Sequence, residues 1–341
     1  MQPVLQCVEQ LTSCRDRGCL PRMLARAVAE LLGSANVGVF FRDQQGDVAL
    51  QMVAGTQFSD AYATDWRDFV EETLFETALK TREIGGRQCA AIKLPASELA
   101  TDQMVLAFDV GNGDPLAESE TISALVRIYA GQIGLIDYAE LDSLTRLLNR
   151  KTFEETFDRL LMSPTQDADN VRFDRRHNPD EEGMPAWLCV IDIDHFKRVN
   201  DTFGHLFGDE VLLRVGELMR KTFRGGDRLF RFGGEEFVVI LNAENEEQAA
   251  TSFNRFRTSV ENHEFPQVGQ VTCSIGFTGV TGMDVPTDVV GRADEALYFA
   301  KENGRNQVCC YEALVAEGLI AKPVPAEAPV AEDFDIDALF G

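Results

Sequence analysis

The sequence predicts a mixed α/β (α+β) protein with two folded domains and an acidic tail. Its 341 residues exceed what one ordinary hydrophobic core accommodates. Strand-like runs between helical segments predict an antiparallel sheet in the first half, and the second half has the element order β-α-β-β-α-β followed by α-β. We therefore set the domain boundaries at residues 1–138, 139–315 and 316–341.

The first domain is predicted to begin and end with helix. Residues 5–33 include LPRMLARAVAELLG, in which apolar residues recur every 3.6 positions and a glycine follows as a stop signal. The runs on either side of Asp-Gln-Gln-Gly at 43–46 predict a β-hairpin, and CAAIKLPA and QMVLAFDV predict two further strands. Apolar residues repeat at helical spacing from Glu118 to Leu141, so we expect a long helix that leads out of the domain.

The second domain is predicted to have a ferredoxin-like order of elements. Asp142 and Ser143 are good N-cap residue types, so a helix is expected to start there. The polar residues 163–186 predict a loop. A strand, a turn and an amphipathic helix follow, and then the hairpin RLFRFGGEEFVVIL, a helix, a strand, a helix and a short last strand.

The charge and the termini limit the classes of partner. A net charge of −24 argues against nucleic acid or an anionic membrane as a partner, and a polyphosphate substrate would need metal ions with local lysine or arginine. The chain lacks an apolar run of roughly 18–20 residues, the length that spans a bilayer. Its first residues do not have the pattern of a signal peptide, so we expect a cytoplasmic protein.

The eight cysteines predict reduced thiols. None forms a CxxC pair and no histidine lies at zinc-binding spacing, which is typical of a cytosolic protein without structural metal. The grouping of Cys7, Cys14 and Cys19 near the N-terminus leaves redox sensing as the alternative.

Four acidic residues stand where a divalent cation could bind. Asp192 and Asp194 end an apolar strand, and strand alternation places their side chains on one face. Gly-Gly allows a tight turn, and Glu235 and Glu236 follow it directly on a short apolar hairpin. Carboxylate oxygens are the ligands that Mg²⁺ prefers. The alternative interpretation is a solvated acidic rim.

The motifs around these acids resemble those of GGDEF-type diguanylate cyclases, which join two GTP molecules into cyclic di-GMP and release pyrophosphate. The resemblance is carried, in order, by DSLTRLLNR at 142–150, DIDHFKRVNDTFGHLFGD at 192–209, GGEEF at 233–237 and ADEALYFAKENGRNQV at 293–308. One such motif is weak evidence, whereas the ordered set is specific. The resemblance implies the fold, the activity and the site residues given next.

The resemblance implies a Mg²⁺ or Mn²⁺ site with carboxylate ligands. Asp192 resembles a metal ligand, with the carbonyl of Ile193 beside it. Glu235 resembles both a metal ligand and the group that activates the 3′-hydroxyl, and Glu236 resembles a second carboxylate near the metals. The reaction is then an in-line phosphoryl transfer that depends on positioning and metal charge.

The nucleotide contacts follow from the same resemblance. Asn200 and Asp209 resemble the residues that read guanine in the family. The chemistry fits this role, because a carboxylate accepts from guanine N1–H and the 2-amino group, a donor pattern that adenine lacks. Lys197 resembles a phosphate-contacting lysine that assists catalysis. For His205 two interpretations stay open, a substrate contact and a packing residue of the turn.

Two further pairs of residues resemble anion-binding groups. Lys301 and Arg305 are four positions apart, so we expect them to share a helix face. They resemble the pair that holds the β- and γ-phosphates in the family; a solvated basic face is the alternative. Arg224 and Asp227, in RGGD, lie shortly before the hairpin and resemble the inhibitory site that binds the product, although RxxD is also common as a surface ion pair.

The first domain resembles a GAF sensory domain in its order of elements rather than in motifs. A ligand-binding sensor and a dimerising domain without ligand are both open, and the helix at 118–141 would transmit a rotation or register change.

From Pro323 onward the chain is predicted to be disordered. Residues 331–341 resemble a motor-switch peptide that docks on a response regulator, so a flagellar or chemotaxis partner and an inert tail are the two alternatives.

The function predicted from the sequence is a Mg²⁺-dependent diguanylate cyclase that acts as a homodimer, because each catalytic domain holds one GTP. One alternative is a catalytically silent receptor of GTP or cyclic di-GMP that acts through the GAF-like domain or the tail. Another is a different purine cyclase, which Asn200 and Asp209 disfavour. Phosphodiesterase activity is not expected, because no second catalytic segment follows.

Overall fold

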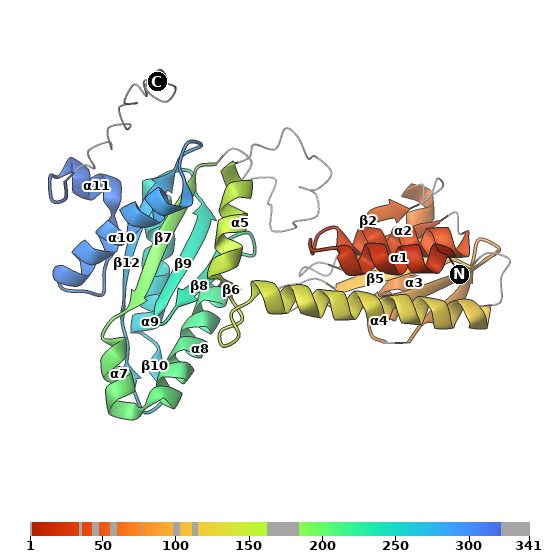
Figure 1. The fold of residues 1–341 in the computed structure, drawn as a ribbon, viewed down its shortest axis with the longest axis horizontal. Coiled ribbons are helices and arrows are strands. Elements are labelled where there is room, and N and C mark those ends of the chain that lie inside the picture. Colours follow the sequence, from red (N-terminus) through yellow and green to blue (C-terminus); the bar gives the residue numbers. More distant parts are fainter. Residues whose placement is uncertain are drawn as a thin grey trace, which may run out of the picture.

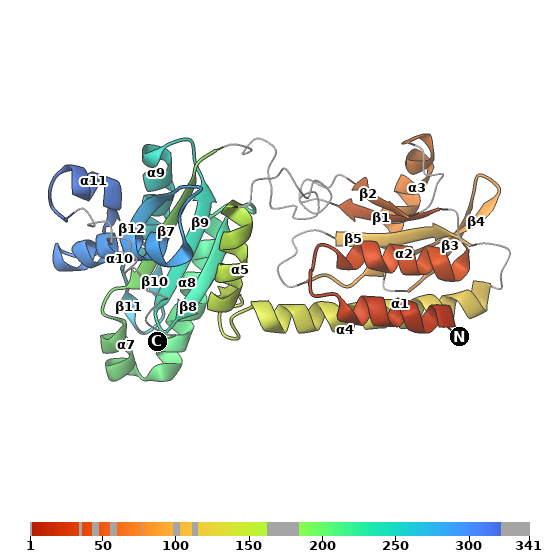
Figure 2. The same ribbon diagram turned by 45° about the horizontal axis from the view of Figure 1, so that its top comes forward.

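The computed structural model describes residues 2–33, 36–42, 48–54, 60–76, 78–97, 103–110, 115–161 and 184–321. Within these residues the chain builds two large sheets at opposite ends of the molecule, and one long helix runs from the first to the second (Figures 1 and 2). Most of the loop predicted at 163–186 and the tail from Pro323 onward lie outside the described residues.

The N-terminal sheet is antiparallel throughout, as predicted. Its strand order is β2-β1-β5-β4-β3. The strands are β1 (Val37–Arg42), β2 (Val48–Ala54), β3 (Lys80–Ile84), β4 (Arg87–Leu94) and β5 (Gln103–Asp109), and the helices are α1 (Gln2–Ser13), α2 (Leu20–Leu32), α3 (Asp60–Thr73) and α4 (Pro115–Glu140). The helix α4 confirms the predicted exit helix, whereas α3 and β3 were not predicted.

The single helix predicted at residues 5–33 is wrong, because the structure has two helices there. The first ends at Ser13, and Pro21 lies in the first turn of the second. Between them Gly18 donates its backbone N–H to the carboxylate of Asp16 at 2.7 Å, which closes a turn. The predicted stop at Gly33 is confirmed, since this residue caps α2 with φ of 58°.

The C-terminal sheet has six strands in the order β13-β12-β7-β9-β8-β6. Its four central strands are antiparallel and have the ferredoxin-like order predicted from the sequence. The strands are β6 (Leu148–Asn149), β7 (Ala186–Ile193), β8 (Arg228–Gly233), β9 (Glu236–Asn242), β12 (Cys273–Val280) and β13 (Val308–Cys310), with the small pair β10 (Glu264–Phe265) and β11 (Gly269–Gln270) beside them. The helices are α5 (Arg150–Leu161), α7 (Phe196–Phe203), α8 (His205–Thr222), α9 (Glu246–Glu261), α10 (Pro286–Glu302) and α11 (Tyr311–Ala316).

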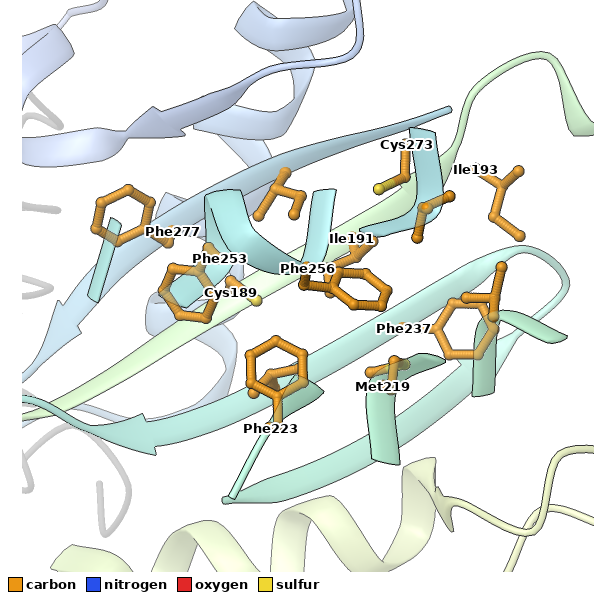
Figure 3. Packing of buried hydrophobic residues seen from close by; sticks show 14 of the residues in the cluster. Cys189, Ile191, Ile193, Met219, Phe223, Phe237, Phe253, Phe256, Cys273 and Phe277 are labelled. Atoms are coloured by element: carbon orange, nitrogen blue, oxygen red, sulfur yellow. The ribbon is translucent and has the colours of Figure 1, made fainter. Parts of the chain in front are cut away.

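Each face of this sheet is covered by its own pair of helices. Alternate residues of β7, Cys189, Ile191 and Ile193, pack with Phe237 and residues of α8 and α9 (Figure 3). The other face, with Leu188 and Val190, packs against α5 and α10. Full burial of an aromatic side chain contributes roughly 1.5–3 kcal/mol, so these layers hold the strand ends firmly.

The helix α10 crosses β12 so closely that only glycine fits at residue 276. A Cβ atom there would lie 2.1 Å from both the Ala293 carbonyl oxygen and the Leu297 backbone nitrogen. These are backbone atoms of α10, which cannot give way as a side chain does. Gly276 therefore sets the height of α10 above the sheet, and with it the position of the residues at the end of this helix.

Two predicted helix boundaries in this domain are wrong. Asp142 does not start a helix; its carboxylate accepts from the backbone N–H and hydroxyl of Thr145, which makes a turn. The helix α5 starts only at Arg150, with the side chain of Asn149 accepting from the N–H of Thr152. The segment after β7 holds two helices rather than one, separated at Gly204.

In the part of the chain that the structure describes, no helix combines the length and the apolar character needed to cross a bilayer.

Candidate functional site

Asp192 lies near the end of β7, on the face of the sheet that α10 covers. It is buried, and Lys301 of α10 donates from Nζ to its Oδ2 at 2.8 Å. Glu236 is directly opposite on β9. Burial raises the pKa of Asp192, Lys301 opposes this effect, and Asp194 and Asp294 add to it.

The tip of the β8–β9 hairpin brings Glu235 toward Asp192. Gly233 and Gly234 have φ of 138° and 53°, which confirms the predicted tight turn with positive φ. Burial raises the pKa of Glu235, and repulsion from Asp192 and from Glu236 raises it further. The hairpin tip therefore places Glu235 within the electrostatic reach of two other acids, Asp192 and Glu236.

The acids do not converge into a ready ligand set. Among the described residues, no group of three or more His, Cys, Asp and Glu side chains lies close enough to hold a metal ion. Asp192 is instead engaged by the ammonium group of Lys301. The carboxylate oxygens nevertheless match the donor chemistry of Mg²⁺, and here the ammonium group of Lys301 supplies the positive charge beside them.

Asp194 does not join Asp192, although strand alternation favours one shared face. Its carboxylate accepts from the hydroxyls of Thr272 and Ser274 at 2.7 Å each, and from the backbone N–H of Asn306 at 3.1 Å. The strand β7 ends at Ile193, so Asp194 is free to turn toward the beginning of β12. Ile193 itself is buried and pairs with Cys273.

Arg231 holds the hairpin tip and was missed in the sequence. Its Nη2 donates to the carbonyl oxygen of Gly234 at 2.9 Å, and its Nη1 donates to the two carboxylate oxygens of Asp142 at 3.0 and 3.2 Å. The guanidinium group thereby ties the turn that follows α4 to the tip that carries Glu235. An arginine within an apolar β-hairpin was the signal that could have revealed it.

The predicted guanine-reading residues come from two packed helices, α7 and α8. A Cβ atom on Gly208 would lie 2.0 Å from Oδ1 of Asn200, so the amide of Asn200 uses the space that this glycine leaves. Asp209 follows Gly208 on α8 and is exposed. Lys197, in the first turn of α7, and His205, which starts α8, are also exposed.

The prediction that Lys301 and Arg305 share a helix face is wrong. The helix α10 ends at Glu302, and Gly304 with φ of 113° takes the chain out of the helix. Arg305 lies beyond this end, with φ of 63° and its backbone N–H donating to the Ala300 carbonyl oxygen at 2.9 Å. Both residues stay at the same end of α10, but the backbone of a loop positions Arg305.

The predicted inhibitory-site residues flank the turn before β8. The backbone N–H of Arg224 donates to Oδ2 of Asp227 at 2.8 Å, and the N–H of Asp227 donates to the Arg224 carbonyl oxygen at 3.1 Å. Asp227 therefore shapes the turn, and the side chain of Arg224 is exposed.

Comparison with known proteins supports the predicted family for this half of the chain. Residues 139–307 match the family model described as diguanylate cyclase, GGDEF domain. Diguanylate cyclase DgcP of Pseudomonas aeruginosa is 39% identical over 170 residues, which are 49% of this chain and 23% of that protein. Diguanylate cyclase DgcZ of Escherichia coli is 35% identical over 173 residues, which are 50% of this chain and 52% of that protein.

The matching segment spans about half of one of these curated relatives and less of the other. Among solved structures, the GGDEF domain of DgcB from Caulobacter crescentus in complex with c-di-GMP is 33% identical, with 51% of this chain and 96% of that chain covered and a TM-score of 0.43. The family model, whose matched segment contains the site described above, assigns residues 139–307 to the GGDEF domain family.

Proposed function

We propose that this chain is a diguanylate cyclase that condenses two GTP molecules into cyclic di-GMP and two pyrophosphates. The observation that carries the proposal is the hairpin tip, where burial and repulsion from Asp192 raise the pKa of Glu235, while Asp192 itself is buried and paired with the ammonium group of Lys301. Acids kept in mutual repulsion are costly for folding, and such clusters occur where chemistry requires them.

The metal ion of the proposed reaction is Mg²⁺ or Mn²⁺. Asp192, Glu235, Glu236 and the Ile193 carbonyl would hold it, and it would supply Lewis-acid charge to the phosphates and the 3′-hydroxyl. With a cation held at Asp192, the ammonium group of Lys301 would be available to contact phosphate. Glu235 would accept the proton of the attacking 3′-hydroxyl, as a carboxylate acting as general base does.

The substrate is bound at two places in this proposal. Asn200 and Asp209 recognise the guanine edge, with Gly208 providing space for the amide, and His205 lies beside them at the start of α8. Lys197, Lys301 and Arg305 contact the triphosphate. In a protein of net charge −24 these cations provide the local attraction that a nucleoside triphosphate needs.

A homodimer is part of the proposal, because one domain holds one GTP and both phosphodiester bonds need two facing domains. The exposed apolar residues Leu135 and Tyr138 of α4, 63% and 81% exposed, support a helix-mediated pairing. They lie on the last turns before the catalytic domain, three positions apart and thus on one face. Pairing there would keep two catalytic domains at the same end.

Regulation is proposed at the two ends of the chain and at one exposed turn. Product inhibition would use Arg224 and Asp227, which form a turn in which Arg224 is exposed. The first domain is proposed as a GAF-like regulatory or dimerising unit, supported by its antiparallel sheet. Residues 331–341 remain proposed as a docking peptide for a response-regulator, flagellar or chemotaxis partner.

The test is synthesis by the purified full-length chain. We expect cyclic di-GMP from GTP and Mg²⁺, separated by chromatography, with loss of product in Glu235→Gln and on removal of divalent metal. A folded, dimeric protein that leaves GTP unconverted at saturating Mg²⁺ would overturn the proposal. Binding of cyclic di-GMP without any synthesis would favour the receptor alternative.

A further inference from the structure

Arg305 lies in an unusual stretch of backbone. After α10, Gly304 has φ of 113°, and the next two residues, Arg305 and Asn306, have φ of 63° and 45°. Left-handed backbone is uncommon for residues other than glycine, and two in succession persist only where the surroundings impose them. The position of the proposed phosphate-binding arginine therefore depends on whatever holds Asn306.

The carboxylate of Asp194 holds the backbone of Asn306. Its Oδ2 accepts from the Asn306 N–H at 3.1 Å and from the Thr272 hydroxyl at 2.7 Å, while Oδ1 accepts from the Ser274 hydroxyl at 2.7 Å. Asp194 is buried, so an unmet acceptor there would be costly. These three donors fix the carboxylate and leave it aimed at the loop.

The side chain of Asn306 is held from the other side by α9. Arg257 donates from Nη1 to Oδ1 of Asn306 at 2.8 Å, and Nδ2 of Asn306 donates to Oε1 of Glu261 at 2.7 Å. Arg257 and Glu261 are also paired with each other at 2.7 Å. Asn306 is thus fixed both through its backbone and through its amide.

We propose that Asp194 and Asn306 are positioning residues that lock the left-handed backbone through which Arg305 reaches the triphosphate. The inference rests on the proposed function for the role of Arg305 in binding phosphate. The end of β7 then serves two tasks: Asp192 faces the metal and phosphate side, and Asp194 fixes the loop that carries the arginine. Neither Asp194 nor Asn306 is assigned a contact with the nucleotide.

A matched pair of substitutions separates backbone from side chain. Asn306→Gly and Asn306→Val both remove the amide that α9 holds, but glycine adopts positive φ freely and a β-branched residue does not. We expect Asn306→Val to raise KM for GTP and to weaken binding of a non-hydrolysable GTP analogue, each by about tenfold, with GMP binding unchanged. Asn306→Gly should stay within about threefold of the wild type in both, since glycine keeps the backbone N–H that Asp194 holds and adopts positive φ without strain.

A double-mutant cycle distinguishes positioning of Arg305 from general loosening. In an Arg305→Ala background, Asn306→Val should cause little further loss of analogue binding, because the group that it misplaces is gone. Asn303→Gly, at the end of the same helix, serves as the control and should bind the analogue like the wild type. Thermal unfolding of each variant checks folding, and Asn306→Ala replaces the valine variant, with a smaller expected loss, if that one does not fold.

Three results would overturn the inference: equal losses in the glycine and valine variants, no loss in the valine variant, or additive losses in the Arg305→Ala background. These binding measurements do not require turnover. If the wild type made no cyclic di-GMP but the valine variant still lost analogue affinity, the proposed function would fail while the positioning role would stand.

Discussion

Both domains bury an aspartate, but the two carboxylates have different surroundings. Asp137 on α4 accepts from Nη2 of Arg17 at 2.6 Å and from the Ser97 hydroxyl at 2.7 Å. Asp192 on β7 also meets one cation, Lys301 at 2.8 Å, but it lies among other acids that raise its pKa.

The difference would separate a structural carboxylate, Asp137, from Asp192, which the proposed chemistry uses. A buried acid with an arginine and a hydroxyl partner stabilises the contact between α4 and the segment before α2. An acid that shares one lysine with neighbouring acids costs stability unless a further cation arrives. We therefore expect substitutions at the first kind to affect folding and those at the second kind to affect turnover.

The largest expected effect comes from neutralising one acid at each place, Glu235 beside Asp192 and Asp137 in the first domain. Glu235→Gln should lower kcat by about a thousandfold or more, because a proton acceptor and a metal ligand are both lost. Asp137→Asn should instead lower the free energy of unfolding by about 1–3 kcal/mol, with kcat retained. Steady-state synthesis and urea unfolding measure the two quantities.

Glu264→Gln, an exposed acid on β10, is the control for both measurements and should change neither. The distinction between a structural and a functional acid would be contradicted if Asp137→Asn lowered kcat in a fully folded protein as much as Glu235→Gln does.

A smaller effect is expected from filling the space beside Asn200. Gly208→Ala places a Cβ atom against Oδ1 of Asn200, which must rotate away from the guanine edge. KM for GTP should rise about tenfold while metal binding stays the same, since a lost base contact costs about 1–3 kcal/mol. Gly216→Ala on the same helix, whose nearest neighbour would be 3.4 Å away, is the matched control. An unchanged KM in Gly208→Ala would remove Asn200 from the base-binding site.

The third prediction concerns pH without metal. Asp192 and Glu235 have folded-state pKa values above their ordinary ones, so they contribute stability at low pH that is lost as pH rises through the raised values. Glu235→Gln should therefore raise the Tm of metal-free protein at pH 7 and lose this advantage below the ordinary Glu pKa of 4.5. Scanning calorimetry in chelator across pH tests it, and a lower Tm for the variant at pH 7 would contradict the sign.

The smallest expected effect lies in the first domain. Leu135→Arg with Tyr138→Arg should weaken pairing of chains through α4, so the specific activity should fall only at low protein concentration. Sedimentation alongside activity measures both, and Leu319→Arg, at an exposed apolar residue beyond α11, is the control. If the double variant loses activity equally at all concentrations, α4 pairing is not what links the domain to catalysis.

Local patterns predicted the elements whose signals lie within a few residues. The hairpin with positive φ at Gly233 and Gly234, the stop at Gly33 and the long exit helix all follow from turn chemistry or 3.6-residue periodicity. The predictions failed where one residue type is compatible with two local structures. Asp142 has the chemistry of a helix cap, but it caps a turn and binds Arg231 instead.

By itself the sequence predicted the GGDEF family that residues 139–307 match and the residue types of the proposed site, because short motifs in fixed order specify chemistry without reference to space. Tertiary structure alone decided that Asp192 meets Lys301 while Asp194 holds Asn306, 112 residues away. It also decided that Arg305 lies in a loop and not on a helix face. The physical reason is that these outcomes depend on which distant donors reach a buried carboxylate, and a single strand's alternation carries no information about them.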